Sequence, residues 1–352
     1  MLRYIALKLA YGVAVLTLVV LIISSVIYLA PVDPARLTFG QRADSESVSS
    51  KRQELGLDQP LYVQLGMYLR DISPIAIHQD NQEAQEKYGY LRLIPMGERV
   101  LSLKLPYLRE SYQYGRKVSD MLWEAIPLTA ILALAAIVLA TLIGLPLGII
   151  ASLKQNSWFD NSAVISSVIG FSLPSYVSAM ILALIFGYYL YDWTGLNVQG
   201  SLIVLDDFGE PQYVWRNLLL PALALGIRPV AIITQLTRSA MLDVLRQDFV
   251  RTATAKGLSY YKVVFKHALR NALNPVVTAI SGWFAALLAG AFFVESVFSY
   301  KGLGSLTVNA LLNFDIPVVL GAVLFTAAIF VLLNLLVDIL YAWLDPRIRL
   351  GE

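Results

Sequence analysis

The sequence contains no cysteine, few charged residues and only two histidines. The absence of cysteine excludes a disulfide framework and every thiolate metal site. The histidines, His78 and His267, are far apart in the chain, and neither has a neighbour at metal-ligand spacing. A formal net charge of +2 gives no electrostatic support for binding a nucleic acid. We therefore expect no metal site and no nucleic-acid partner.

Charge is scarce along the whole chain, and apolar side chains replace it. Only 15% of the 352 residues are charged, 57% are hydrophobic, and the mean hydropathy is +0.63. A soluble globular domain carries about 25% charged residues. A chain of this length cannot bury so much apolar side chain in a water-soluble core. Lipid is the solvent that accepts it, and we predict a membrane-embedded protein.

The sequence contains several stretches that are long and apolar enough to cross a membrane. A bilayer core of about 30 Å requires about 20 apolar residues in a helix, and a helix satisfies its own backbone in lipid. The first stretch follows Arg3 and Lys8 and is too long for a typical cleaved signal region, so we interpret it as a retained span. The predicted spans lie within residues 1–32 (which include the N-terminal cytoplasmic end), 125–153, 161–190, 217–237, 272–294 and 316–343.

Basic residues gather in alternate loops, and this pattern predicts the orientation. Residues 238–271, between the fourth and fifth spans, are strongly basic, whereas the loop 191–216 is acidic. Lys154 lies in the short turn between the second and third spans, and the C-terminal tail carries Arg347 and Arg349. All the basic segments fall on one side when both termini are cytoplasmic. We therefore predict six spans with both termini inside.

Residues 33–119, which follow the first span, are polar and of mixed charge. This segment is too long for a simple loop, so we predict a small outer domain. Helical spacing recurs within it at four leucines: Leu55, Leu61, Leu65 and Leu69. Residues 73–98 are only weakly patterned and predict no element.

The basic segment after the fourth span has the pattern of two amphipathic helices. Apolar residues of the first repeat with helical spacing at Leu242, Leu245, Phe249 and Ala253. Gly257 then interrupts the pattern, and Ser259 is placed to cap the second helix. The second helix has an inward apolar face (Val263, Val264, Leu269) and an outward basic face (Lys262, Lys266, Arg270). From these residues alone, contact with lipid headgroups and docking to a protein stay equally open.

Arg228 interrupts the fourth predicted span, beside Gly226 and Pro229. A charge at membrane depth faces a wet cavity or a partner, and it is by default a candidate for a translocation path. The alternative is a helix break near the membrane interface, with the arginine reaching out to the headgroups. Both interpretations are open at this point.

The sequence has no residues arranged for catalysis. It lacks a nucleophile elbow, paired intramembrane carboxylates and the Gly-x-x-x-x-Gly-Lys-Ser/Thr phosphate loop. The alternative from another class is an ion-coupled secondary transporter of small solutes. Such transporters usually have two related halves with broken helices in matching positions, and the sequence shows no such duplication. We expect a protein without catalytic residues.

The basic segment resembles the cytoplasmic loop of permeases in binding-protein-dependent ABC importers. The signature of that loop is Glu-Ala-Ala, three residues and Gly, followed later by Ile-x-Leu-Pro. Gly257 and Ala253 match it. Arg251, Thr252 and Arg270 stand where the signature has Glu, Ala and Pro. The stretches DFVRTATAKGL and HALRNALNP are similar to the oligopeptide and dipeptide (nickel) permease branch, and to the first permease subunit of its pair.

The resemblance extends over nearly the whole chain. Further segments similar to motifs of the family are residues 30–34, 55–61, 236–241, 294–298, 301–304 and 344–349. Residues 73–104 have no recognised counterpart. The resemblance implies an all-α polytopic membrane protein with the type I ABC importer permease fold. It would have six transmembrane helices, a small extracytoplasmic domain at 33–119 and a permease core at 120–352, and it would lie in the bacterial inner membrane.

The resemblance also implies partners and a division of labour. A homologous sister permease would complete the path, two cytoplasmic ATPases would bind ATP and Mg²⁺, and an extracytoplasmic binding protein would deliver the substrate. The chain itself would lie in lipid as a non-catalytic subunit without a cofactor of its own. The residues that would couple it to the ATPases are Asp248, Arg251, Thr252, Ala253, Ala255, Lys256, Gly257, Leu258 and Ser259. Members of this branch carry oligopeptides, dipeptides, nickel complexes or some sugars, and peptides are the cargo we expect.

Overall fold

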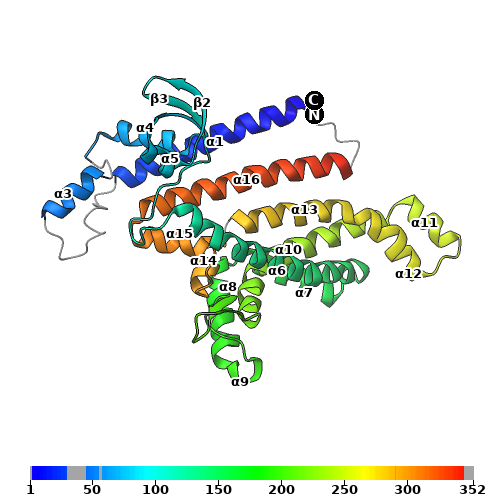
Figure 1. The fold of residues 1–352 in the computed structure, drawn as a ribbon. Helices are drawn as coiled ribbons and strands as arrows, with labels where there is room; N and C mark the ends of the chain where they lie inside the picture. The colour runs from blue at the N-terminus through cyan, green and yellow to red at the C-terminus, as the bar shows by residue number, and fades with distance from the viewer. Residues whose placement is uncertain (1, 30–44, 55–57, 290, 345–352) are drawn as a thin grey trace. The chain divides into compact units, whose positions relative to one another are not determined.

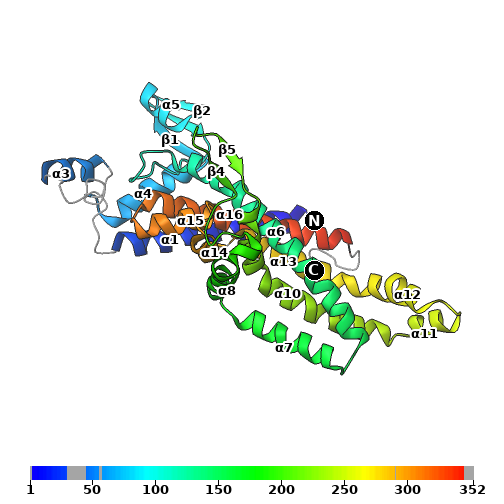
Figure 2. The same ribbon diagram turned by 90° about the horizontal axis from the view of Figure 1, so that it is seen from below.

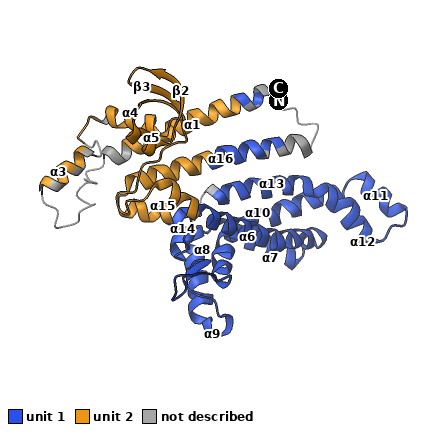
Figure 3. Ribbon diagram, in the orientation of Figure 1, with its two compact units in different colours: residues 1–6, 126–305, 329–352 blue, residues 7–125, 306–328 orange. Residues whose placement is uncertain are grey.

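The computed structural model describes residues 2–29, 45–54, 58–289 and 291–344. The described chain divides into two units (Figure 3). The first comprises Met1–Ala6, Ile126–Ser305 and Ile329–Glu352, and the second comprises Leu7–Ala125 and Leu306–Ala328. Several predicted motif positions lie outside the described residues: 30–34, Leu55, Arg347 and Arg349.

Long apolar helices dominate the fold (Figure 1). Among the described residues, five are long and apolar enough to cross a membrane, and a bent pair supplies a sixth candidate. The five include α1 (Leu2–Leu29), α6 (Val118–Leu153), α10 (Arg216–Leu245), α13 (Leu269–Ala289) and α16 (Ile316–Leu344). The expectation of a helical, polytopic membrane protein is therefore confirmed.

The bent pair consists of α7 (Trp158–Ser172) and α8 (Ser175–Leu182), which continues into the π-helix η2 (Ala183–Tyr189). The two arms are bent by 106°. Pro174 lies between them. Proline has no backbone N–H to donate, and its ring disfavours helical geometry at the preceding residue. The apolar stretch 161–190, which the sequence predicts as one span, is therefore two helical pieces.

The first unit is built on α6, α7, α10 and α13, and α6 and α10 approach each other closely. A Cβ atom placed on Gly148 would lie 2.6 Å from the carbonyl oxygen of Thr234, and one on Gly144 would lie 2.9 Å from that of Val230. Glycine is therefore required where these two backbones meet. Small residues at such contacts allow membrane helices to gain packing energy without a hydrophobic driving force.

Shorter elements complete the first unit. The acidic loop carries α9 (Tyr191–Thr194) and a two-stranded antiparallel sheet of β4 (Ile203–Leu205) and β5 (Pro211–Tyr213). After α13 follow α14 (Phe292–Val297) and the beginning of α15 (Leu303–Leu312).

The second unit contains a small α/β domain in the outer segment. Its elements are α4 (Leu61–Ile72), β1 (Ile75–Gln79), α5 (Gln82–Tyr88), β2 (Leu91–Met96) and β3 (Arg99–Leu103), and the separate helix α3 (Ser45–Glu54) precedes them in the chain. The strands form an antiparallel sheet in the order β1-β3-β2. The helix expected from the leucine spacing is confirmed from Leu61 onward as α4, whereas residues 58–60 are not helical. Tyr68 of α4 packs with Val20 of α1 and with Ile316 and Leu320 of α16.

The sheet is the main correction to the sequence analysis, which assigned no element to residues 73–98. In β1 the side chains alternate in burial, because Ala76 and His78 are buried while Ile75 and Ile77 are exposed. Both faces of the strand carry apolar residues, so the alternation of polar and apolar residues that predicts a strand is missing.

The inner side of the sheet encloses a polar cluster. Asp71 accepts hydrogen bonds from Arg109 Nε at 2.9 Å and from the Tyr88 hydroxyl at 3.2 Å. Burial lowers the pKa of the neighbouring Lys104 to about 8. His78 stacks on the Tyr88 ring with 4.2 Å between centroids, and burial lowers its pKa. His78 is therefore a buried residue of the domain core, and its surroundings favour the neutral imidazole.

Candidate functional site

The predicted cytoplasmic segment folds as two helices around a glycine turn, at one end of α10 and α13 (Figure 1). The first is α11 (Asp248–Ala255), and the second begins as α12 (Tyr260–Lys262) and runs through the π-helix η3 (Val263–Ala268) into α13. Gly257 between them has a φ of +75°, in the left-handed region that glycine enters without strain. The helix, glycine turn and helix predicted from the sequence are confirmed.

The inner faces of these helices form an apolar core of nine buried residues: Ala240, Met241, Val244, Val250, Ala253, Val263, Val264, Ala268 and Ala272. Leu153, at the end of α6, packs against the same core. Because closely packed side chains resist deformation, the core attaches α11 firmly to α10 and α13. A packed support of this kind is suited to passing a displacement on as a rigid-body movement.

Two details differ from the sequence pattern. Phe249, one of the apolar residues at helical spacing, is 39% exposed, and Val250 takes the inward position beside Ala253. The reason is that α10 ends at Leu245, so α11 starts a new helical phase. Ser259 occupies the N-cap position of α12, but its side chain makes no capping hydrogen bond.

Most of the predicted coupling residues lie on the outer face of the segment. Asp248 and Arg251 are 96% and 77% exposed, with 3.7 Å between their charged groups. The other exposed members of the set are Thr252, Ala255, Lys256, Gly257 and Ser259. Leu258 is half-buried, and Ala253 belongs to the core. Ala253 therefore supports the segment from within and presents no surface.

The outer face combines aromatic rings with positive charge. Its exposed aromatic residues are Phe249, Tyr260, Tyr261 and Phe265, and its exposed cations are Arg246, Arg251, Lys256, Lys262, Lys266 and Arg270. The rings of Tyr261 and Phe265 lie 4.5 Å apart. Aromatic residues and arginine are enriched at protein interfaces. The face is therefore suited to a protein partner that offers apolar pockets and acidic side chains.

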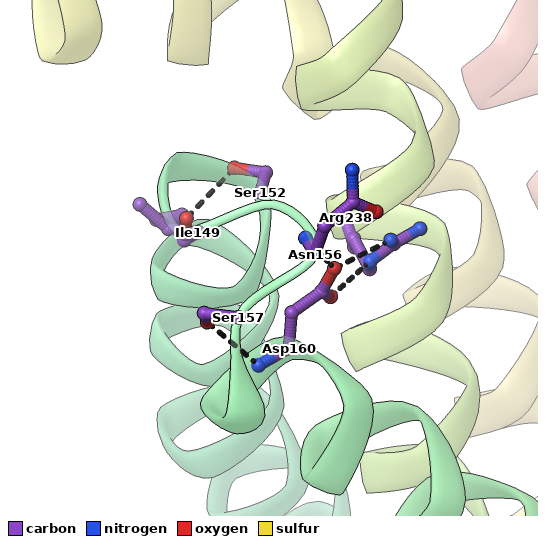
Figure 4. A network of polar contacts seen from close by, with 6 residues as sticks. All are labelled: Ile149, Ser152, Asn156, Ser157, Asp160 and Arg238. Atoms are coloured by element: carbon purple, nitrogen blue, oxygen red, sulfur yellow. Dashed lines mark hydrogen bonds and ion pairs between the residues drawn. The ribbon is translucent and has the colours of Figure 1, made fainter.

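Behind this segment lies an ion pair that the sequence analysis did not identify (Figure 4). Arg238 on α10 donates from Nε and Nη2 to both carboxylate oxygens of Asp160 on α7, with 2.7 Å between Nη2 and Oδ2. Asp160 is 1% exposed. It also accepts the backbone N–H of Asn156 at 2.9 Å. In the sequence, each partner is only a charged residue near the end of a predicted span. Nothing in the sequence shows that these two ends lie together, so the pair could not be predicted.

Arg228, the candidate path residue, lies inside α10, which continues through it without a break. The alternative of a helix break at this position is therefore wrong. Its Nε lies 3.3 Å from the carbonyl oxygen of Phe171, near the end of α7, and its guanidinium lies 5.4 Å from the centre of the Phe171 ring. These contacts place a half-buried positive charge between α7 and α10.

A second buried carboxylate belongs to Glu295 of α14, which lies outside the helices long enough to span a membrane. Glu295 is fully buried, and it accepts hydrogen bonds from the Thr129 hydroxyl at 2.7 Å and from the Ser305 N–H at 3.0 Å. Burial raises its pKa to about 7. A Cβ atom on Gly302 would lie 2.5 Å from this carboxylate. The glycine-rich turn before α15 therefore closes around Glu295.

The described residues contain no group of three or more His, Cys, Asp or Glu side chains that could hold a metal ion. A cavity of about 550 Å³ lies between α6, α7 and α10, with Leu139, Phe159 and Ile227 in its walls. Because these walls are apolar, the cavity is unsuited to a nucleotide or another charged cofactor.

Comparison with protein families gives two matches that together cover almost the whole chain. Residues 144–350 match the family described as binding-protein-dependent transport system inner membrane component. Residues 1–133 match the N-terminal model of such membrane components.

Curated relatives match over nearly their full length. The dipeptide transport system permease protein DppB of Alkalihalophilus pseudofirmus is 33% identical over 99% of this chain and 100% of the relative. The di/tripeptide transport system permease protein DppB of Pseudomonas aeruginosa is 36% identical, and the glutathione transport system permease protein GsiC of Salmonella paratyphi A is 34% identical, each over 99% of both chains. This chain therefore belongs to the family of binding-protein-dependent transport system inner membrane components, non-catalytic permease subunits with the mostly helical, polytopic type I fold of ABC importers.

Proposed function

We propose that this chain forms half of the translocation path of an ATP-driven importer of di- and oligopeptides, and that a homologous sister permease forms the other half. Membership of the family makes it a multi-pass inner membrane protein that works with an ATPase and a substrate-binding protein. The peptide cargo is supported by relatives whose names specify dipeptides, di- and tripeptides, and glutathione.

The observation that carries the proposal is the exposed face of α11 on its apolar core. Two cytoplasmic ATPases would bind ATP and Mg²⁺ in sites of their own, and one of them would receive residues Asp248–Ser259 in a groove. The chain itself would need no cofactor. An exposed helix on a packed support passes the closure of the ATPases to α10 and α13 without losing the movement in a flexible linker.

This assignment also predicts on which side of the membrane the remaining elements lie. Residues 238–271 and both termini would face the cytoplasm, whereas the loop 191–216 and the α/β domain at 33–119 would face the binding protein. Arg228 would line the path, where a half-buried guanidinium can attract the carboxylate of a peptide.

Reconstitution of the complex tests the proposal. The chain is purified with its sister permease, the ATPases and the binding protein, and inserted into lipid vesicles. We expect uptake of a mixture of synthetic di- and tripeptides that requires both ATP and the binding protein. Uptake that follows a proton or sodium gradient without any ATPase would instead identify a secondary transporter and overturn the proposal.

Gly257 allows a sharper test of the coupling segment. Gly257→Val forces a β-branched residue into left-handed geometry, although no atom lies within 4 Å of the new Cβ. We expect at least about a fivefold loss of peptide-stimulated ATPase activity, with normal membrane insertion. Gly257→Asn is the matched control, because asparagine tolerates this geometry, and it should remain close to wild type. Normal stimulation in the valine variant would contradict the assignment of residues 248–259.

A further inference from the structure

The ion pair between Asp160 and Arg238 ties α7 to the helix that carries the coupling segment. We propose that Asp160 is a positioning residue for transport, which makes α7 move together with α10 and α11 when the ATPases close. This inference rests on the proposed function, since it requires that α11 receives the movement.

The geometry of the pair supports a role in positioning. Arg238 contacts both oxygens of Asp160 through two different nitrogens, and such a two-point contact fixes orientation as well as distance. Burial of two charges gives little net stability, and an apolar pair of similar volume is often as stable or more so. A buried pair at this position is therefore better explained by the relative placement of its two helices than by stability.

Asp160 also stabilises the turn that precedes α7. It accepts the N–H of Asn156, whose φ of +62° is left-handed, and the Ser157 hydroxyl oxygen accepts the N–H of Asp160 at 3.3 Å. Thus the turn after α6, the first turn of α7 and the side of α10 meet at one carboxylate (Figure 4).

The connection from this carboxylate to the coupling segment is short and continuous. Arg238 lies about 10 Å along α10 from the last residue of that helix, Leu245. Within this stretch, Ala240, Met241 and Val244 belong to the apolar core that holds α11. A displacement of α11 therefore reaches Arg238 through these packed side chains, and it does not depend on the two-residue break between α10 and α11.

α7 depends on this contact because the chain does not continue as straight helix at either of its ends. It is preceded by the turn at Asn156 and followed by the 106° break before α8. Figure 2 shows α7 running beside α10. Near the far end of α7, Arg228 contacts Phe171, and a Cβ on Gly170 would lie 3.2 Å from Ile227. Side-chain contacts with α10 at both ends therefore decide whether α7 follows the coupling segment.

The test uses the complete importer in lipid discs. The variants are Asp160→Asn, Arg238→Gln and the double variant, together with Arg238→Lys, which keeps the charge but loses the two-point contact. Matched controls on the same side of the chain are Asp243→Asn and Lys154→Gln, both at exposed positions. For each variant we measure how much ATPase co-purifies, the basal ATPase rate, and its stimulation by the binding protein with the peptide mixture.

Spin labels provide a readout that a purely structural role would not change. The chain has no cysteine, so Ile165→Cys on α7 and Asp243→Cys on α10, both exposed and outside the predicted coupling residues, introduce sites that are unique within this chain. In the otherwise unchanged protein we expect the distance between these labels to be the same without nucleotide and with ATP and vanadate. In Asp160→Asn we expect two different distances, and in Arg238→Lys a broadened one.

For Asp160→Asn we expect normal ATPase binding and basal rate, with stimulation reduced at least about fivefold. The double variant should be no worse than the single variants, and the two controls should stay within about twofold of wild type. Full stimulation in Asp160→Asn with an unchanged label distance would overturn the proposal. If that variant does not assemble, full stimulation and a sharp distance in Arg238→Lys would overturn it equally. Such a result alongside a defective Gly257→Val variant would refute the role of Asp160 and leave the coupling segment intact.

Discussion

Asp160 and Glu295 are both buried carboxylates in the same unit, but the protein compensates their burial in different ways. Asp160 has a guanidinium against both oxygens. Glu295 has no ion pair among the described residues, and it is held by the Thr129 hydroxyl and the N–H of Ser305 at the start of α15. The first arrangement joins α7 and α10 through opposite charges, whereas the second closes a turn with hydrogen bonds and a helix N-terminus.

The difference shows what each arrangement can do. A carboxylate with a guanidinium partner must stay charged to hold that partner, so Asp160 can tie α7 to α10 at any physiological pH. A helix N-terminus carries only a partial positive charge of about half a unit. It compensates burial incompletely, so the pKa of Glu295 rises to about 7. The turn before α15 should therefore respond to pH, while the contact at α7 should not.

The largest expected effect is on the pH dependence of stability. Burial raises the pKa of Glu295 from its usual value of 4.5 to about 7, so the folded state binds the proton more tightly than the unfolded state. The stability from this group is therefore complete below pH 4.5 and is lost as the pH rises towards 7, by on the order of 3 kcal/mol. Glu295→Gln imitates the neutral form and should lack this loss.

Thermal unfolding of the purified complex from pH 5 to pH 8 measures the effect. The difference between wild type and Glu295→Gln should shift steadily in favour of the variant as the pH rises to 7. A difference that stays constant over this range would show that Glu295 remains charged, and the contrast with Asp160 would disappear.

The next effect concerns the glycines that surround Glu295. A Cβ atom on Gly304 would lie 2.5 Å from the Cα of Phe292, which is backbone and cannot turn away. Gly304→Ala should therefore destabilise the complex by about 2 kcal/mol through overpacking. Gly282→Ala is the matched control, because no atom lies within 4 Å of its new Cβ and alanine favours the helix. Equal melting temperatures for the two variants would show that the turn has room.

Sequence reasoning succeeded where one physical signal dominates. Long uncharged stretches predicted the membrane helices, because lipid rejects charge and unpaired backbone alike. The spacing around Gly257 predicted two helices and a turn, because amphipathic patterns and left-handed glycine are local signals. The phase of α11 was missed at Phe249, since a break of two residues after Leu245 resets the helix.

The contacts behind the candidate site could not be predicted in the same way. Asp160 and Arg238 are 78 residues apart, and Thr129 and Glu295 are 166 apart. Each pair depends on the order in which helices pack, which no local pattern encodes. Gly302 and Gly304 lie in a stretch that resembles a family motif. The reason why glycine is needed at these positions is that they enclose the Glu295 carboxylate, and only the fold shows this.

The smallest effect separates the hydroxyl of Thr129 from the rest of the Glu295 site. This hydroxyl donates to Glu295 at 2.7 Å and accepts the N–H of Leu303 at 2.8 Å, so it links the carboxylate to the start of α15. Thr129→Val keeps the shape and removes both bonds, which should cost about 1 to 2 kcal/mol.

Thr129→Ser retains the hydroxyl and should lose less, through the missing methyl group alone. Because Glu295 loses a donor that favours its charged form, Thr129→Val should also raise the pKa of Glu295 further. The pH-dependent loss of stability would then extend to higher pH in the valine variant than in the serine variant. Identical melting temperatures and pH profiles for the two variants would mean that the Thr129 hydroxyl contributes nothing. The backbone amides at the N-terminus of α15 would then be the groups that hold Glu295, in contrast to the guanidinium that holds Asp160.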